Sequence, residues 1–261
     1  MTLPDILFED DHLVAFDKPA GMPVVPSGHR ARGGSLIEMA RERYGRQLAA
    51  VHLMDEGASG VVLFARTKPA LDFLSGQFQS KTIECAYLAL VALVPAGGAR
   101  AAMRDGAGRL PAEFSVDLPL GRDRDTPGRL RVARGRAGSP AETRVRVLEP
   151  FERFAWVECR PLGGRAHQAR AHLAACAAPV VNDGLYGDAP VPLLLSELKR
   201  RYKAGREPER PLVSRLALHA ASVSFIHPAG RERLGVTAPL PDDLGVALKY
   251  LRKFGRGGRA V

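Results

Sequence analysis

Short apolar runs separated by turn-forming residues recur along the whole chain. They are rich in β-branched or aromatic residues, or alternate between polar and apolar positions, which is typical of strands. The runs are HLVAFD at 12–17, GVVLFAR at 60–66, ECAYLALVALV at 84–94, TRVRVLE at 143–149, FAWVECRPL at 154–162 and LALHAASVSFIHP at 216–228. The first run ends at KPAGMP, whose prolines and glycine predict a turn that directs Lys18 outward.

Other stretches have the spacing of helices. Ser35 and Glu38 form a capping box before the first of them, and Thr67 is a candidate N-cap for the second. Strands in runs with helices placed irregularly between them predict an α+β fold with a mostly antiparallel or mixed sheet. The predicted helices are LIEMARERYG at 36–45, KPALDFLSGQFQSK at 68–81, RAHQARAHLAACA at 165–177 and PDDLGVALKYLRKF at 241–254.

The chain is long enough for one large core, and we expect a single domain over residues 1–254. Residues 96–140 are dominated by Gly, Ala, Pro and Arg, which predicts surface loops or a hairpin with arginines available to a nucleic acid. Residues 255–261 predict a basic, flexible tail. About ten residues precede the first predicted strand, so we expect no separate N-terminal RNA-binding domain.

Composition narrows the classes of partner. Lys and Arg total 38 against 28 Asp and Glu, a formal net charge of +10, which favours a polyanionic partner, although a merely basic globular protein would show the same excess. The chain has no apolar run of about 18 residues and no signal peptide, so we expect a cytoplasmic protein without a membrane segment. The three cysteines form no C-x-x-C pair, so neither a disulfide framework nor a zinc ribbon is indicated.

Common catalytic motifs are missing. His167 and His172 are five residues apart, which on a helix separates them by about 140° and argues against a zinc site. The sequence has no G-x-S-x-G elbow, no phosphate-binding loop and no dinucleotide fingerprint. We therefore expect no metal, no nucleotide and no other cofactor.

The remaining candidates are one carboxylate and a set of polar groups far from it in sequence. Asp55 lies in the glycine-rich HLMDEGASG stretch, and an aspartate ionised at neutral pH is a nucleophile that an arginine could orient. On spacing alone, the alternative is that Asp55 is a turn or cap residue and Arg165 a surface residue at a helix start. The other candidates are Tyr87 in a predicted strand and the GGRAHQAR cluster, with Arg165, His167, Gln168 and Arg170.

Several segments, in order and over nearly the whole chain, resemble the RluA-type family of RNA pseudouridine synthases. DHLVAFDKPAGMPVVPS resembles the opening strand and Lys-Pro-x-Gly loop of that family, HLMDEGASGVVLFART its catalytic motif, and ECAYLALV its tyrosine strand. The later matches are PLGRD with GSPAETRVRVLE, GGRAHQARAHLAACAAPVVNDGLYGD, and RLALHAASVSFIHPAGRERLGVTAPLPDDL.

The resemblance implies a pseudouridine synthase fold, a mainly antiparallel mixed sheet flanked by helices around a central basic cleft. It implies a monomeric enzyme, without cofactor or metal, that isomerises specific uridines of structured ribosomal or transfer RNA. By position, Asp55 is the catalytic carboxylate, Arg165 its ion-pair partner and Tyr87 the ring against the target base. The expected substrate-binding residues are His52, Leu53, His167, Gln168, Arg170 and Lys18.

The sequence departs from the family pattern around the predicted site. The family has His-Arg-Leu-Asp where this chain has His52-Leu53-Met54-Asp55, so the arginine is replaced by an apolar residue that could wedge into a base stack but not contact phosphate. Ala58, Cys85 and Ala166 replace a threonine, a lysine and a threonine. Two interpretations stay open: an active synthase with altered nucleotide flipping, or a catalytically impaired RNA-binding protein acting as a chaperone or assembly factor.

Overall fold

A computed structural model describes residues 2–26, 34–95, 104–105, 108–126, 128–133, 138–187, 191–203, 205 and 207–255. The chain divides into two compact units, neither of which is one continuous segment. Unit 1 comprises Met1–Tyr87, Pro161–Ala166 and His219–Pro239, and unit 2 comprises Leu88–Arg160, His167–Leu218 and Leu240–Val261. The 96–140 region is therefore described only in part, and the predicted tail lies outside the described residues except for Gly255.

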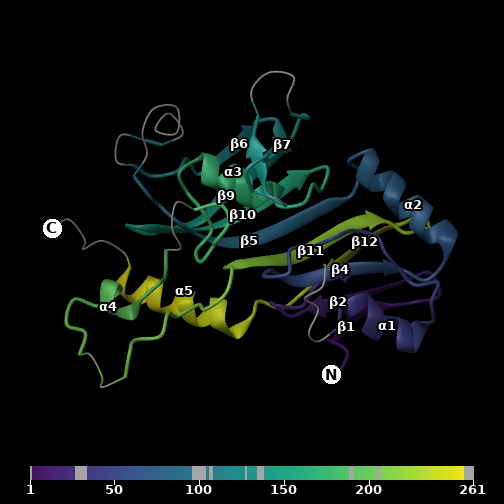
Figure 1. The fold of residues 1–261 in the computed structure, drawn as a ribbon, viewed down its shortest axis with the longest axis horizontal. Helices are drawn as coiled ribbons and strands as arrows, with labels where there is room; N and C mark the ends of the chain where they lie inside the picture. The colour runs from purple at the N-terminus through teal and green to yellow at the C-terminus, as the bar shows by residue number, and fades with distance from the viewer. Residues whose placement is uncertain are drawn as a thin grey trace. The chain divides into compact units, whose positions relative to one another are not determined.

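The strands of unit 1 form a mixed sheet (Figure 1). They are hydrogen-bonded in the order β1-β2-β4-β11-β5, with β3 on β4 and β12 on β11. The β4–β11 pair is parallel, whereas β1–β2, β2–β4, β3–β4 and β11–β12 are antiparallel. The bounds are β1 Ile6–Glu9, β2 Leu13–Lys18, β3 Ala49–Ala50, β4 Ser59–Ala65, β5 Glu84–Ala92, β11 Leu218–Ile226 and β12 Arg233–Thr237.

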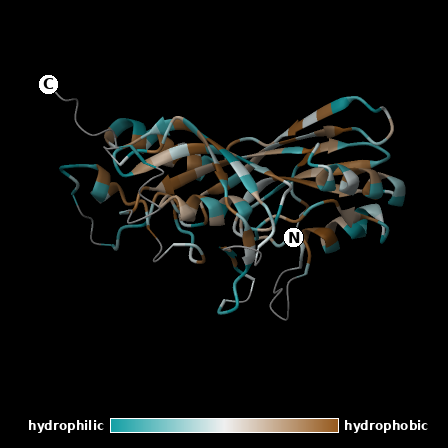
Figure 2. Cartoon of the chain, turned by 90° about the horizontal axis from the view of Figure 1, so that it is seen from above, coloured by the Kyte–Doolittle hydropathy of each residue, from teal (hydrophilic) through white to brown (hydrophobic). Residues whose placement is uncertain are grey.

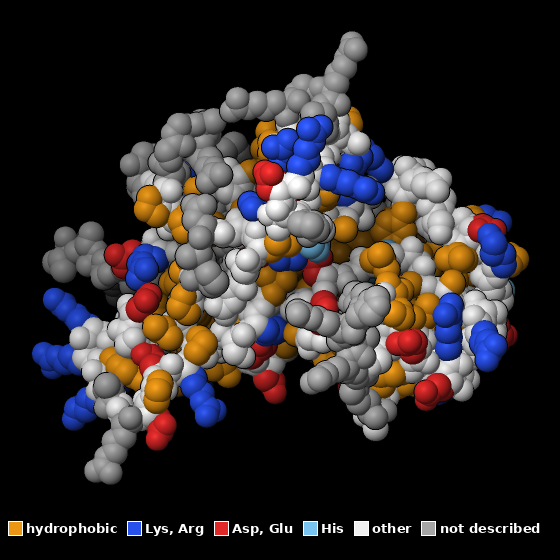
Figure 3. Space-filling view, viewed as in Figure 1, with side chains coloured by type: hydrophobic (Ala, Val, Ile, Leu, Met, Phe, Trp, Pro, Cys, Tyr) orange, Lys and Arg blue, Asp and Glu red, His pale blue; other side chains and the backbone are white. Residues whose placement is uncertain are grey.

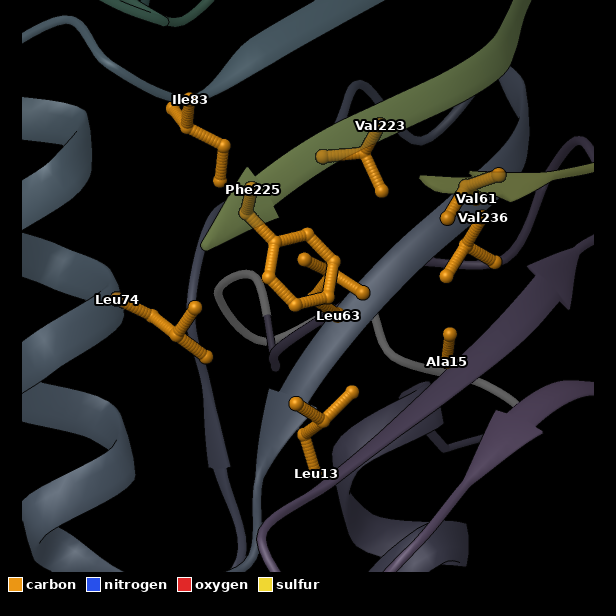
Figure 4. Packing of buried hydrophobic residues seen from close by; sticks show 9 residues of the cluster. All are labelled: Leu13, Ala15, Val61, Leu63, Leu74, Ile83, Val223, Phe225 and Val236. Atoms are coloured by element: carbon orange, nitrogen blue, oxygen red, sulfur yellow. The ribbon is translucent and has the colours of Figure 1, made fainter. Parts of the chain in front are cut away.

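Two helices belong to unit 1, α1 (Leu36–Tyr44) and α2 (Lys68–Gln79). The capping box before α1 is present, and the Thr67 hydroxyl accepts the Ala70 N–H at 3.3 Å, so both predicted helix starts are confirmed. Helix α2 directs Leu74 onto Phe225 and Leu63 of the sheet, in a cluster of fully buried apolar side chains (Figure 4). Burial of each large side chain stabilises the fold by about 1.5–3 kcal/mol. This packing fixes α2 against the strand that follows the Asp55 loop.

Unit 2 continues β5 and pairs it with further strands in the order β5-β10-β9-β6, beside a separate two-stranded hairpin, β7–β8. Strands are coloured mostly as apolar in Figure 2, while α5 carries both colours. The apolar positions of α5, Leu244, Ala247, Leu248 and Leu251, are buried. The bounds are β6 Glu113–Asp117, β7 Leu120–Arg122, β8 Leu130–Val132, β9 Glu142–Pro150, β10 Phe154–Leu162, α3 Gln168–Ala175, α4 Leu195–Leu198 and α5 Asp242–Phe254.

The predicted α+β class with a mostly antiparallel, mixed sheet is confirmed. Some predicted boundaries are wrong. The first strand begins at Ile6, inside the segment expected to precede the first strand, and strand β6 lies within the region predicted to be loops or a hairpin. Helix α3 begins at Gln168 instead of Arg165, because His167 has a φ of 58°, which is incompatible with a right-handed helix.

No helix among the described residues is long and apolar enough to cross a membrane.

Candidate active site

Asp55 lies in an ordered loop between β3 and β4. The loop closes as a turn, in which the Ala58 N–H donates to the Asp55 carbonyl at 3.1 Å. Met54 is buried, Asp55 is half-buried, and the Leu53 side chain is 59% exposed. The loop is therefore anchored by its methionine and presents the carboxylate beside a solvent-facing leucine.

Gly60 fixes the backbone directly after this loop. It has a φ of 110° and pairs with Ala220 in the parallel β4–β11 contact. A Cβ on Gly60 would come within 2.2 Å of the Ala220 carbonyl oxygen, so only glycine fits this close approach. One residue earlier, the buried Ser59 hydroxyl lies 3.0 Å from Nδ1 of buried His219.

Lys18 is fully buried, so the prediction that its turn directs it outward is wrong. The Gly21 N–H also donates to the Glu56 carbonyl at 2.8 Å. A buried ammonium needs hydrogen-bond acceptors, and backbone carbonyls of the two loops supply them. Lys18 thus ties the loop after β2 to the loop that carries Asp55. Its Nζ donates to the carbonyls of Pro19 (2.9 Å), Met22 (2.7 Å), Glu56 (3.1 Å) and Ala58 (2.7 Å).

We predict that Lys18→Met lowers the free energy of unfolding by about 3 kcal/mol, because it leaves several buried carbonyls without a donor. Urea denaturation of the full chain measures the change. The matched control is Lys68→Met, which removes a lysine whose side chain is 74% exposed and ion-paired with Asp72, and should shift stability by less than about 1 kcal/mol. Equal effects of the two substitutions would contradict the proposal that Lys18 holds the two loops together.

His52 is held as a neutral ring within the same segment. Its Nε2 accepts the Leu63 N–H at 3.2 Å, and its ring centroid lies 5.4 Å from that of Phe78 in α2. Burial lowers the pKa of His52 to about 4, against an opposing hydrogen bond with the Leu53 backbone. At neutral pH the side chain is therefore an uncharged brace between the Asp55 loop and β4, and it offers no cation to a phosphate.

The lowered pKa of His52 makes stability depend on pH. As pH falls, the unfolded chain binds a proton on His52 near the ordinary pKa of about 6.5, whereas the folded chain binds it only near pH 4. The contribution of neutral His52 to the free energy of unfolding is therefore complete above pH 6.5 and is lost as pH falls toward about 4. We expect a loss of about 2–3 kcal/mol over that interval. Urea titrations of wild type and His52→Gln at several pH values measure this loss, because glutamine does not titrate and removes the contribution of His52 to the slope of unfolding free energy against pH. Parallel slopes would show that His52 does not titrate this way.

Tyr87 lies near Asp55 at the start of β5. Burial raises the pKa of Tyr87 well above its usual value, and the charges of Cys85 and Asp55 raise it further. The half-buried phenol therefore stays protonated and is close enough to sense the Asp55 carboxylate. A neutral aromatic ring with a hydroxyl donor next to a carboxylate suits contact with a planar base.

Arg165 is exposed on the irregular turn between β10 and α3. The turn packs against α2, where a Cβ on Gly164 would lie 3.1 Å from the Phe78 ring. Since the His52 ring also packs on Phe78, the Asp55 loop and the Arg165 turn meet the same helix residue. The predicted catalytic residues Asp55, Tyr87 and Arg165 thus all belong to unit 1.

The three further candidates of the GGRAHQAR cluster, His167, Gln168 and Arg170, lie in unit 2 with protein partners. The Gln168 amide is buried and donates to the Glu142 carbonyl at 2.7 Å. Buried Arg170 makes two bonds to Asp183, at 2.8 and 2.7 Å. Half-buried His167 lies 3.2 Å from the Tyr186 hydroxyl. These groups brace the start of α3, and no cluster of His, Cys, Asp and Glu suited to a metal occurs in the described part of the chain.

Three residues that build this region escaped sequence reasoning. The sequence identifies Phe78 only as an apolar helix position, because its contacts with the Asp55 loop and the Arg165 turn depend on tertiary packing. Asp183 and Tyr186 hold Arg170 and His167, and their one local signal is the NDGLYG turn, in which Asp183 accepts the N–H groups of the two residues that follow Gly184. Such an Asx-type turn is visible in the sequence, but the ion pair with Arg170 is not.

Comparison with known proteins places this geometry in context. Residues 12–175 match the family model described as RNA pseudouridylate synthase. The chain is 35% identical over 95% of its length to "Ribosomal large subunit pseudouridine synthase D" of Xanthomonas campestris, covering 70% of that protein. It is 33% identical over 95% of its length to "Ribosomal large subunit pseudouridine synthase C" of Vibrio cholerae, covering 69%. Across the most similar curated relatives the chain spans 61 to 70% of the relative's length.

Among solved structures, the chain superimposes on "Human RNA Pseudouridylate Synthase Domain Containing 4" with a TM-score of 0.68 and 26% identity, covering 95% of this chain and 92% of that one.

Proposed function

Since this chain belongs to the RNA pseudouridylate synthase family, we propose that it isomerises a uridine of structured RNA to pseudouridine. The observation that carries the proposal is the half-buried Asp55, held on an ordered loop beside protonated Tyr87. In the reaction the bond between N1 of uracil and the ribose breaks and a bond from carbon 5 forms. Carbon 5 loses a proton and N1 gains one, so no cofactor or oxidant is consumed.

We assign three roles within unit 1. Asp55 supplies the carboxylate that attacks the nucleotide or assists cleavage of the glycosidic bond. Arg165 orients that carboxylate through its guanidinium. Tyr87 holds the face of the uracil while the base turns, and its protonated hydroxyl donates to the base without adding charge. Lys18 and His52 act indirectly, by holding the Asp55 loop in place.

The proposed substrate is large-subunit ribosomal RNA, which the names of both curated relatives support. Transfer RNA is the alternative target. A uridine inside a stem must leave the stack before its glycosidic bond is accessible, at a cost of a few kcal/mol. The central basic cleft implied by the family resemblance remains a prediction.

The proposal is tested by mapping pseudouridines with carbodiimide labelling in ribosomal and transfer RNA. RNA is compared from the parent strain, a strain lacking this protein, and the same strain carrying the wild-type protein. We expect one or a few ribosomal signals to vanish on deletion and to return on complementation. An unchanged map in both RNA classes would rule out the enzymatic role.

We predict that Leu53 is the side chain that takes the place of the flipped nucleotide. Leu53→Ala should lower kcat/KM by about tenfold without loss of stability, because a 59% exposed side chain contributes little to the core. Leu53→Arg restores the arginine of the family pattern, and should steepen the slope of log affinity against log salt by about 0.7–0.9. Single-turnover kinetics and RNA titrations in KCl measure the two effects. No loss of activity in Leu53→Ala would exclude the wedge.

A further inference from the structure

A cluster of cations in unit 2 has no role in the site described above. It lies where α4 packs against α5. Figure 3 shows Lys and Arg side chains projecting at the edge of the molecule where Figure 1 places α4 and the segment after it. We name it the α4–α5 basic surface, formed by Lys199, Arg200, Arg201, Lys203, Lys249 and Lys253, all exposed.

An ion pair and a backbone hydrogen bond bring the two halves of this surface together. The Arg153 guanidinium pairs with Glu197 of α4 at 3.0 Å, and the adjacent Glu152 N–H donates to the Gly255 carbonyl at the end of α5 at 3.1 Å. One short turn thus contacts the ends of both helices. The segment after α4 is closed at its base by a bond of 2.8 Å from the Leu212 N–H to the Leu193 carbonyl. The cations therefore stand on an ordered base.

Three acidic side chains near this surface have partners, while Glu207 in the segment after α4 is exposed and forms no ion pair with the six cations. Glu149 is bound by Arg252, Glu197 by Arg153, and Glu209 accepts the Ser196 N–H at 2.9 Å. Among described residues, no carboxylate forms an ion pair with the six cations of the surface, whereas many other surface arginines of the chain do form one. A concentration of exposed positive charge without protein counter-charge is the footprint of a polyanion partner.

We infer that the α4–α5 basic surface binds the sugar-phosphate backbone of RNA outside the target nucleotide. This inference rests on the proposed function. A membrane surface fits less well, because the apolar face of α5 is buried in the protein and cannot enter a bilayer. The surface lies outside residues 12–175, which match the family model.

The test uses the full chain and titrates binding to two RNAs, transcribed large-subunit ribosomal RNA and a stem-loop of about 20 nucleotides. The surface variant combines Arg200→Gln, Arg201→Gln, Lys203→Gln and Lys249→Gln. The matched control removes the same charge from exposed positions of unit 1, Arg43→Gln, Arg46→Gln, Lys68→Gln and Arg231→Gln. Thermal unfolding verifies that both variants are folded.

We expect the surface variant to bind the long RNA more than about tenfold more weakly near 0.1 M KCl, and its slope of log affinity against log salt to fall by about 3. The control should change the slope by less than about 1, and binding of the stem-loop should respond equally in both variants. Equal loss for surface and control variants on the long RNA would overturn the inference, since only net charge would then matter. So would loss of binding to phosphatidylserine vesicles with unchanged RNA binding.

This outcome is separate from that of the proposed function. Binding is measured without any reaction, so the inferred RNA-binding surface can be confirmed even if the wild-type chain forms no pseudouridine. Conversely, the wild-type chain could form pseudouridine normally while the surface variant binds the long RNA as well as the wild type does. That result would exclude the α4–α5 basic surface as an RNA-binding surface and leave the proposed enzymatic function standing.

Discussion

Asp55→Asn should lower the single-turnover rate of pseudouridine formation by about a thousandfold or more while leaving RNA affinity within about threefold. Asparagine has nearly the same shape as aspartate, but it can neither attack a sugar nor carry the charge that an arginine would orient. The loop should keep its structure, because backbone groups anchor it: the Asp55 carbonyl accepts the turn bond, and the Glu56 and Ala58 carbonyls accept bonds from Lys18. Tritium release from carbon 5 of labelled uridine measures the rate.

The same variant separates the two interpretations of the altered motif. If the chain is an RNA chaperone or assembly factor of this fold, Asp55→Asn should complement a deletion as well as the wild type and leave every pseudouridine in place. If it is an enzyme, the variant should bind RNA and leave the target uridine unmodified. The matched control is Glu56→Gln, which removes the charge of the next, exposed residue and should keep full activity.

Elements with strong local signals were predictable from the sequence. The capping box at Ser35, the Thr67 N-cap and the apolar runs gave α1, α2 and the central strands, because these signals act within a few residues. Short elements such as β1 and β12 escaped prediction, since a strand of four or five residues with mixed polarity is formed by its partners. The start of α3 was misplaced because alanines and a leucine favour a helix, while the positive φ at His167 is imposed by its surroundings.

The catalytic site itself stays a prediction, because its residues are assigned by resemblance. Asp55, Tyr87 and Arg165 were named from the resemblance, and all three fall in unit 1. Lys18 illustrates the limit of sequence reasoning, because a lysine at the end of a strand and before proline is ordinarily a solvated group. Its burial depends on carbonyls of a loop about 40 residues away, which no local pattern encodes. His52 likewise becomes neutral only because tertiary packing buries it.

Arg165→Met should lower kcat about a hundredfold with little change in KM, since the guanidinium is proposed to position the Asp55 carboxylate and not to hold RNA. Stability should change by less than about 0.5 kcal/mol, because Arg165 is exposed on a turn that is fixed by glycine and by contact with Phe78. Arg165→Lys should recover only part of the loss, because an ammonium keeps the charge but cannot offer two parallel donors.

Lys81 provides the matched control for Arg165. It is exposed, and its side chain lies near Gly163, where a Cβ would come within 3.6 Å of it. Lys81→Met therefore removes one positive charge beside the same turn without touching the proposed partner of Asp55. Rapid-quench kinetics under saturating RNA should show a normal rate for this variant. A rise in KM with normal kcat in Arg165→Met, or an equal defect in Lys81→Met, would make Arg165 a general contact for RNA and leave Asp55 oriented by other groups.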